Sequence, residues 1–406
     1  MTDFKISDVV SCATQRAVRG LPTIWRIGCG RRGRGLGVFT FAFCFGAGPR
    51  LTLSVIDTEE RLAALLPALR AIDRVALDTE ADSLHAYPEK LCLLQISLAG
   101  RNELIDPLAG LDLSPFFEIL SSRDLLLHGA DYDLRLLYRA HRFVPRSVFD
   151  TMPAARLLGH TEFSLTVLVG KLLGVHLEKG PQKADWARRP LTPRMVNYAR
   201  NDTRYLRPLA DLLRTQLEQK GRLEWHRQVC EWLVADCARP RVVDTDQVWR
   251  LKGADKLDRR GLAVLRELWN WRDKEAMAAN KPPYFILNHE TLVSLANAAA
   301  QMEDVTNLLP ARFPPARRER ALAAIERAAA LSPKEWPGFN RPSGRRPSRE
   351  DKESFDKLRQ KRDRIAGELQ IDPNLIASRA TLSLLAEDQE THQKELMNWQ
   401  RELLMG

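Results

Sequence analysis

Paired cysteines are missing from this sequence of 406 residues. Its six cysteines are scattered and none belongs to a CxxC pair, which excludes a zinc ribbon and a dense disulfide framework. Isolated cysteines of this kind are typical of free thiols in a reducing compartment, so we expect a cytoplasmic location. No apolar run reaches the roughly 18–20 residues that a membrane-spanning helix needs, so we expect no membrane association.

Most of the chain has little net positive charge. Lys and Arg outnumber Asp and Glu by 62 to 52, which gives a formal net charge of +10. Residues 1–50 hold eight basic and two acidic side chains, whereas residues 51–240 hold 25 of each. More than half of the excess therefore lies in the first fifty residues, and net charge says little about the function of the rest.

Residues 1–50 contain few helix or strand signals. Gly28, Gly30 and Gly33 match the GxGxxG dinucleotide fingerprint, which needs an amphipathic helix after it and an acid about 20 positions later. No such helix follows and the next acid is Asp57, so we reject a bound nucleotide cofactor. The Arg/Gly cluster could instead contact RNA phosphates, and the apolar run after it, which is too short to span a membrane, could serve in targeting or touch a membrane surface. We expect a disordered extension that is dispensable for the chemistry.

From residue 51 the pattern becomes regular and predicts an α/β domain over residues 51–240. Short apolar runs predict strands over 51–56, 75–77, 91–98, 103–105 and 125–128. Amphipathic spacing predicts helices over 57–71, 133–140, 153–158, 165–173, 193–220 and 223–237. Because the strands come first and helices dominate afterwards, the order favours one sheet with helices packed against it.

The remaining residues predict helical domains. Residues 241–330 show only helical periodicity. Residues 331–350 contain four prolines and an Arg cluster, which predicts an extended linker. Residues 351–406 return to a helical pattern, so we expect a second helical domain there.

Two carboxylates near the end of a predicted strand are the first chemical signal. Asp78 and Glu80 are two positions apart, so on a strand their side chains share one face. Two like charges in this position cost free energy unless a cation or a donor neutralises them. A strand followed by a solvated turn would explain this pair equally well.

Two further elements strengthen the signal. Asp133 lies at the start of a helix after a strand and a small-residue turn, although an acid favoured by the helix dipole would look the same and Asp131 would serve as well. Tyr198 and Asp202 are four residues apart, so on a helix they lie on one face. A packed tyrosine beside a surface acid would also explain that spacing.

Together, in this order and spacing, the four acids and the tyrosine resemble the DEDDy exonuclease superfamily of the RNase-H-like fold. More narrowly, the chain is similar to the ribonuclease D family, with support from His128, the run 149–152 and the run 183–191. Residues 265–273 and 282–288 resemble the helical HRDC domain. The resemblance implies an α/β exonuclease domain, with a mixed sheet flanked by helices, followed by all-α HRDC-type domains.

The resemblance also implies a two-metal mechanism with Mg²⁺ or Mn²⁺, the hard cations that carboxylates select. Asp78 would bridge both ions, and Glu80 and Asp202 would complete the shell of the first. Asp133 would hold the second ion through water, and Tyr198 would orient the attacking water. Because metal ions lower the pKa of bound water, no histidine base is required. We therefore expect a structural role for His128.

The implied function is a monomeric 3′→5′ exoribonuclease that releases nucleoside 5′-monophosphates. Its RNA partners would be precursor tRNA and other small structured RNAs. A 3′→5′ DNA exonuclease is one alternative, and a nucleic-acid-binding protein with a vestigial exonuclease fold is another. Basic residues of the helical region could contact RNA phosphates without reading sequence: Lys252, Lys256, Arg259, Arg260, Arg317 and Arg318.

Overall fold

A computed structural model describes residues 55–98, 100–178, 180–240, 244–339 and 347–406. The extension predicted over residues 1–50 lies outside the described residues. So do residues 51–54 of the first predicted strand and residues 340–346 of the predicted linker. Ile56, which is described, forms an isolated parallel bridge with Ile105.

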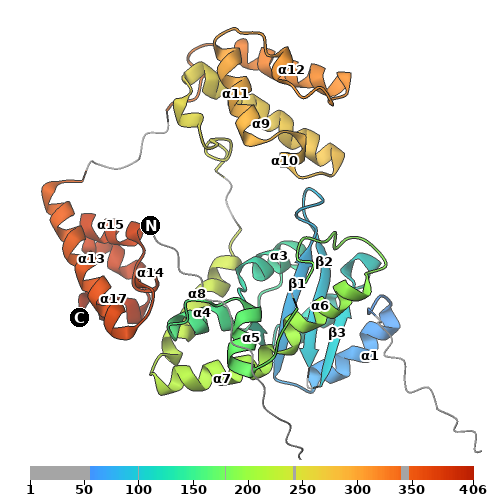
Figure 1. The fold of residues 1–406 in the computed structure, drawn as a ribbon, viewed down its shortest axis with the longest axis vertical. Helices are drawn as coiled ribbons and strands as arrows, with labels where there is room; N and C mark the ends of the chain where they lie inside the picture. The colour runs from blue at the N-terminus through green and yellow to red at the C-terminus, as the bar shows by residue number, and fades with distance from the viewer. Residues whose placement is uncertain (1–54, 99, 179, 241–243, 340–346) are drawn as a thin grey trace, which may run out of the picture. The chain divides into compact units, whose positions relative to one another are not determined.

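A mixed five-stranded sheet is the centre of the α/β part (Figure 1). Its strands are β1 (Arg74–Ala81), β2 (Leu91–Leu98), β3 (Arg101–Ile105), β4 (Asp124–Leu127) and β5 (Ser147–Asp150). They lie in the order β3-β2-β1-β4-β5. The pairs β1–β2 and β2–β3 are antiparallel, whereas β1–β4 and β4–β5 are parallel. The strand that carries Asp78 and Glu80 is therefore the middle one, with a neighbour on each side.

Alternate side chains of β1 pack into two different apolar cores, one on each face of the sheet. Val75 and Leu77 belong to a core shared with the helices α1 (Glu59–Arg70), α2 (Ser114–Leu120) and α3 (Asp131–His141). Ala76 belongs to the opposite core, which includes α4 (Thr151–Leu157), α5 (Leu165–Leu173) and α7 (Leu206–Gln219). Because side chains alternate along a strand, Asp78 and Glu80 share the face of Ala76.

The predicted helix over 193–220 is two helices, which corrects one expectation. The first is α6 (Pro193–Arg204) and the second is α7, with Tyr205 between them. Pro208 lies in the first turn of α7. In one continuous helix its ring would clash with the backbone carbonyl group four residues earlier. That carbonyl belongs to Arg204, where α6 ends. Helix α8 (Leu223–Cys237) matches its predicted bounds.

Sequence patterns missed one helix and one strand, and they predicted both β1 and β3 too short. Helix α2 and strand β5 were not expected, because seven and four residues are too few to show a clear period. Strand β1 continues through the polar residues to Ala81, beyond the predicted end at Leu77. The two acids therefore lie within the strand rather than in a turn after it.

The rest of the chain is helical, as expected. Residues 244–339 hold α9 (Arg259–Ala279), α10 (Pro283–Ile286), α11 (His289–Ala300) and α12 (Pro315–Ala329). Residues 347–406 hold α13 (Arg349–Leu369), α14 (Pro373–Ile376), α15 (Arg379–Glu387), α16 (Gln389–His392) and α17 (Asn398–Met405). Among the described residues, no helix combines the length and the apolar character needed to cross a membrane.

Candidate active site

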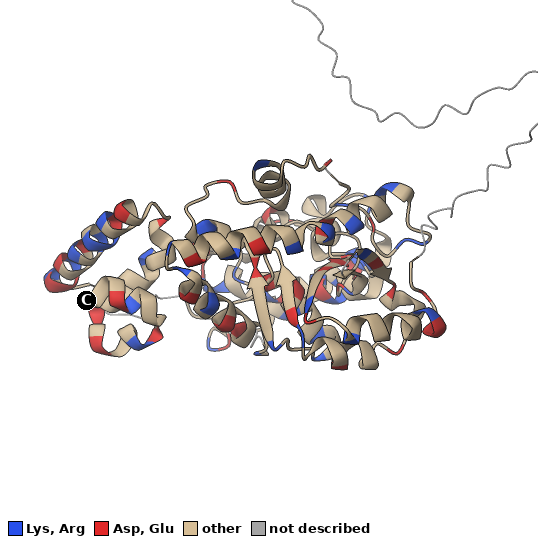
Figure 2. Ribbon diagram, turned by 90° about the horizontal axis from the view of Figure 1, so that it is seen from below, with Lys and Arg blue, Asp and Glu red and all other residues tan. Residues whose placement is uncertain are grey.

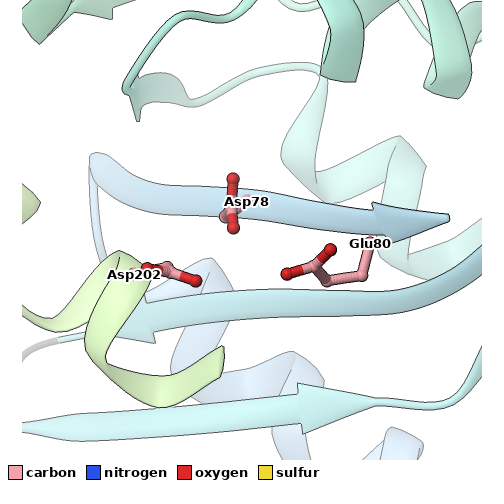
Figure 3. Close-up of side chains that lie close together, drawn as sticks. All are labelled: Asp78, Glu80 and Asp202. Carbon is pink, nitrogen blue, oxygen red and sulfur yellow. The ribbon is translucent and has the colours of Figure 1, made fainter. Parts of the chain in front are cut away.

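Three carboxylates from two elements meet on one face of the sheet. Asp78 and Glu80 project from β1, and Asp202 projects from α6 toward them (Figure 3). One oxygen of each carboxylate lies within 4.8 Å of one oxygen of each of the others. The structure thus brings together three of the four predicted acids in an arrangement that can hold a metal ion.

A cap at the start of helix α6, apolar packing along it and a hydrogen bond near its end hold the helix against the sheet. Thr192 caps the helix by accepting a hydrogen bond from the backbone N–H of Met195. Met195 and Ala199 pack in an apolar cluster with residues of β2 and β3. Near the other end, the hydroxyl of Ser97 donates to the buried hydroxyl of Thr203 at 2.7 Å. Asp202, the residue before Thr203, is thereby directed toward β1.

Asp133 is buried beside the same cluster, in the first turn of α3. Its carboxylate accepts hydrogen bonds from the backbone N–H of Thr79, at 3.1 Å, and from the Thr79 hydroxyl. Thr79 is the residue between the two acids of β1. Asp131, which sequence could not distinguish from Asp133, is exposed and pairs with Arg135. The structure therefore places Asp133 at the site and Asp131 outside it.

A second buried carboxylate fixes the turn that leads to Asp133. Asp150 accepts hydrogen bonds from the backbone N–H groups of Gly129 and Ala130, both at 2.8 Å, and from Met152 at 2.9 Å. Gly129 has φ of +74°, a conformation that residues with a side chain rarely adopt. The run 149–152, which supported the family resemblance, therefore has a definite role: it ties β5 to the turn after β4.

Burial raises the pKa values of all four carboxyl groups, and the charges of neighbouring carboxylates add to it; for Asp133 that neighbour is Asp150. Burial is the largest cause for each. It is followed for Asp78 by the charges of Asp133, Asp202 and Glu80, and its pKa lies well above the usual range. The pKa of Glu80 is raised to about 9, and those of Asp133 and Asp202 to about 7. A cation among these groups would remove the repulsion, which is the electrostatic signature of a metal site.

Tyr198 lies one helical turn before Asp202 on the same face of α6, and its hydroxyl favours the ionised form of the Asp202 carboxyl group, which lowers the pKa of that group against the effect of burial. Burial raises the pKa of the tyrosine, with further contributions from the charges of Asp202 and Glu80, so the phenol stays protonated at neutral pH. Its ring lies 6.0 Å from that of the buried Trp186. The tyrosine and two of the acids line a cavity of about 690 Å³, whose walls include Asp78, His128, Ser164, Gln182, Tyr198 and Asp202.

Gln95 is a residue of this site that sequence reasoning missed. It pairs with Asp78 across β1 and β2, so the two side chains point to the same face. Its side chain is fully buried, and among the described residues neither atom of its amide has a hydrogen-bond partner. Asp202 Oδ2 is also buried without a partner there. The available signal was a glutamine inside the apolar run of β2.

The donor set fits a divalent cation. It consists of carboxylate oxygens, which hard cations prefer, and it contains no cysteine or histidine. A buried polar atom without a partner costs about 1–3 kcal/mol, so the unpaired atoms of Asp202 and Gln95 also indicate a site that a hydrated ion completes. Exonuclease folds of this type use divalent metals.

Four of the six basic residues predicted to contact RNA are bonded to other residues of the segment 244–339. Arg259 donates to the backbone carbonyls of Pro333, Trp336 and Pro337. Two others also bond backbone carbonyls: Arg260 donates to Ala300, and Arg318 donates to Thr306 and Pro310. Arg317 pairs with Glu275 at 2.9 Å.

Acidic and basic residues are intermixed along the helices (Figure 2). Lys252 and Lys256 are exposed and have no ion pair among the described residues, so the predicted surface depends mainly on them.

Comparison with known proteins agrees with this geometry. A 3′-5′ exonuclease family model matches residues 53–218, and an HRDC domain model matches residues 261–308. Ribonuclease D of Granulibacter bethesdensis is 31% identical over 362 residues, which cover 86% of this chain and 90% of the relative. Ribonuclease D of Desulfotalea psychrophila is 28% identical over 360 residues, which cover 86% of this chain and 96% of the relative.

A solved structure gives the same result in three dimensions. The crystal structure of Escherichia coli RNase D, described as an exoribonuclease involved in structured RNA processing, superposes with a TM-score of 0.69 at 26% identity. The match covers 87% of this chain and 96% of that one, so it includes the sheet, the candidate site and the helical region. This chain belongs to the ribonuclease D family.

Proposed function

We propose that the chain is a metal-dependent 3′→5′ exoribonuclease that trims the 3′ ends of precursor tRNA and other small structured RNAs, releasing nucleoside 5′-monophosphates. The observation that carries the proposal is the convergence of Asp78, Glu80 and Asp202, two of which line one cavity together with Tyr198. RNA is favoured over DNA as the substrate because the curated relatives are ribonucleases.

Two divalent ions, Mg²⁺ or Mn²⁺, fit the carboxylates of the site. Asp78, Glu80 and Asp202 would hold one of them, and Asp133 would contribute to the second together with Asp78. When bound, such ions stabilise the charge of the phosphate in the transition state and make a strong nucleophile available at neutral pH. The protonated Tyr198 hydroxyl would orient the attacking water, because the tyrosine lines the same cavity as Asp78 and Asp202.

Degradation of a 3′-extended tRNA tests this function directly. We expect stepwise shortening from the 3′ end in Mg²⁺, release of nucleoside 5′-monophosphates, and no shortening in EDTA. Electrophoresis of 5′-labelled RNA, with a DNA strand of the same sequence as the comparison, measures it. Faster degradation of the DNA would favour the DNA exonuclease, and binding of the tRNA without metal-dependent cleavage would favour the vestigial fold.

Replacing Tyr198 with Phe is expected to lower turnover by about 10- to 100-fold, the usual cost of removing an orienting hydrogen bond around a metal site. Metal affinity should change little, because the phenol is not one of the clustered oxygen ligands. Tyr205→Phe is the matched control, since Tyr205 lies at the end of the same helix and outside the cavity. Single-turnover rates and Mn²⁺ titrations of both variants separate the two effects. Equal rates for Tyr198→Phe and wild type would contradict the assigned role.

We also propose that residues 347–406 form a second HRDC-like domain, because their helices repeat those of the first with an offset of 90 residues. Helices α9 and α13 both have 21 residues, and each ends in a left-handed cap, Asn280 and Gln370. A four-residue helix that starts with proline follows each. The equivalent arginines make the same contact: Arg272 donates to the carbonyl of Leu287, and Arg362 donates to that of Ala377.

This repeat supports the proposed organisation of the chain. It consists of an exonuclease domain over residues 51–240, a first HRDC domain over 241–330, a linker over 331–350 and a second helical domain over 351–406. Lys252 and Lys256 would contribute phosphate contacts from the first helical domain. We further propose that the enzyme works as a cytoplasmic monomer and that residues 1–50 are dispensable for cleavage.

A further inference from the structure

His128 lies in the wall of the cavity that contains Asp78, Tyr198 and Asp202. It follows the last residue of β4, which pairs with β1 on the side opposite to β2. The imidazole is not part of the oxygen cluster that can hold a metal ion. The proposed reaction also needs no base at this position. A partly exposed ring in a substrate cavity is therefore available for contact with the substrate itself.

The hydrogen bonds of Thr151 determine which ring nitrogen carries the proton. The Thr151 hydroxyl has one hydrogen, which it donates to the backbone carbonyl of Leu127 at 3.1 Å. It must therefore accept the bond that joins it to His128 Nδ1 at 2.9 Å, so Nδ1 carries the hydrogen. In a neutral ring, the other nitrogen, Nε2, then has only a lone pair.

The ring is neutral at physiological pH. Burial lowers the pKa of His128 to about 4, and no carboxylate contributes to the shift. Within the described ranges, Nε2 has no hydrogen-bond partner of its own. The cavity wall thus presents a fixed hydrogen-bond acceptor whose orientation is set by Thr151 and the end of β4.

Only some groups of a nucleic acid can donate to such an acceptor. Phosphate and ring oxygens of the backbone accept hydrogen bonds and cannot donate them. Donors on the bases change from one nucleotide to the next, whereas an exonuclease must accept every base in turn. Two donors do not depend on the base. One is the 3′-hydroxyl of the last nucleotide, which RNA and DNA share, and the other is the 2′-hydroxyl, which every RNA nucleotide has and every DNA nucleotide lacks. A single 2′-deoxy substitution distinguishes between them.

We propose that His128 Nε2 accepts a hydrogen bond from the 2′-hydroxyl of a nucleotide bound in the cavity, and that His128 is therefore a residue that selects RNA over DNA. The proposal rests on the exoribonuclease function proposed above and adds to it the group by which the sugar is recognised. It changes the role expected from sequence, in which His128 was structural.

The test uses the full-length protein in Mg²⁺ and RNA oligonucleotides that differ by one 2′-deoxy sugar, placed at the last, the second-last or the third-last nucleotide. For wild type we expect one of the first two positions to lower the single-turnover rate by about five- to tenfold, the value of one hydrogen bond. In His128→Ala the all-RNA rate should fall by the same factor, and the deoxy substitution should then have no further effect. His128→Gln, which keeps an acceptor near the position of Nε2, should recover part of the discrimination.

Two results would overturn the proposal. One is a wild-type rate that is the same for all four oligonucleotides, which needs no variant and so does not depend on whether a variant folds. The other is an equal loss in His128→Ala on ribo and deoxy substrates, since a purely structural histidine would leave their ratio unchanged. Failure of the exoribonuclease function itself would look different, because wild type would then degrade none of the oligonucleotides and the proposal would fail with it.

Discussion

Asp78→Asn is expected to lower the rate of RNA cleavage by roughly 10³-fold, because the ions that Asp78 would hold supply several kcal/mol of transition-state stabilisation and each 1.4 kcal/mol corresponds to a factor of ten. Asparagine has the same shape, so the fold should persist. The metal-free variant should even be more stable than wild type. Burial and the charges of Asp133, Asp202 and Glu80 all disfavour an ionised Asp78 when no cation is present.

The opposite signs of these two effects make the prediction specific. A residue that served only the fold would lose stability and activity together. Asp131→Asn is the control, because Asp131 is exposed beside the same turn and its partner is Arg135. We expect that variant to cleave RNA at the wild-type rate. Thermal unfolding in EDTA and single-turnover cleavage in Mg²⁺ measure the two properties, and a slow but destabilised Asp78→Asn would argue against a metal role.

Metal binding should release protons and strengthen steeply with pH. Without metal, the raised pKa values of about 7 for Asp133 and Asp202 and about 9 for Glu80 mean that these groups retain protons near neutral pH. Bound cations require the ionised carboxylates, so affinity should rise by about tenfold per pH unit for each proton released. Calorimetric titration with Mn²⁺ in buffers of different ionisation enthalpy counts those protons. An affinity that is constant between pH 6 and 8 would contradict this electrostatic account.

The same pKa values set the stability of the metal-free protein. In the unfolded chain these carboxyl groups titrate near pH 4, so between about pH 4 and 9 the folded protein binds more protons than the unfolded one. The free energy of unfolding must then decrease as pH rises through that window. Excess Mn²⁺ should reverse the loss, because a ligand that binds only the folded state stabilises it.

The acids of the site could be found from sequence because their spacing repeats the geometry of regular structure. Two positions along β1 and four along α6 place side chains on one face. The strand and the helix both form, although β1 extends beyond its predicted end and the predicted helix divides into α6 and α7. The choice between Asp131 and Asp133 could not be made in this way. It depends on Thr79 of strand β1, whose backbone N–H and hydroxyl donate hydrogen bonds to the carboxylate of Asp133 on helix α3.

Residues whose role depends on partners far along the chain were not predictable. Arg259 looked like an exposed base, but it bonds carbonyls more than seventy residues later. Gln95 could be recognised as part of the site only from the register of β1 and β2, which places it opposite Asp78. The same is true of His128, whose tautomer follows from a threonine on the next strand-to-helix turn.

Asp78 and Glu80 lie on the middle strand of the sheet, whose backbone is bonded on both sides, whereas Asp202 lies on a helix that packs against one face. The free energy of local unfolding differs between these two kinds of element. A helix docked at the surface of a domain unfolds locally at a lower free energy than the central strand. A cation held by Asp78, Glu80 and Asp202 would therefore link β1 to α6 reversibly. We expect removal of such an ion by a chelator to loosen α6 before it loosens β1.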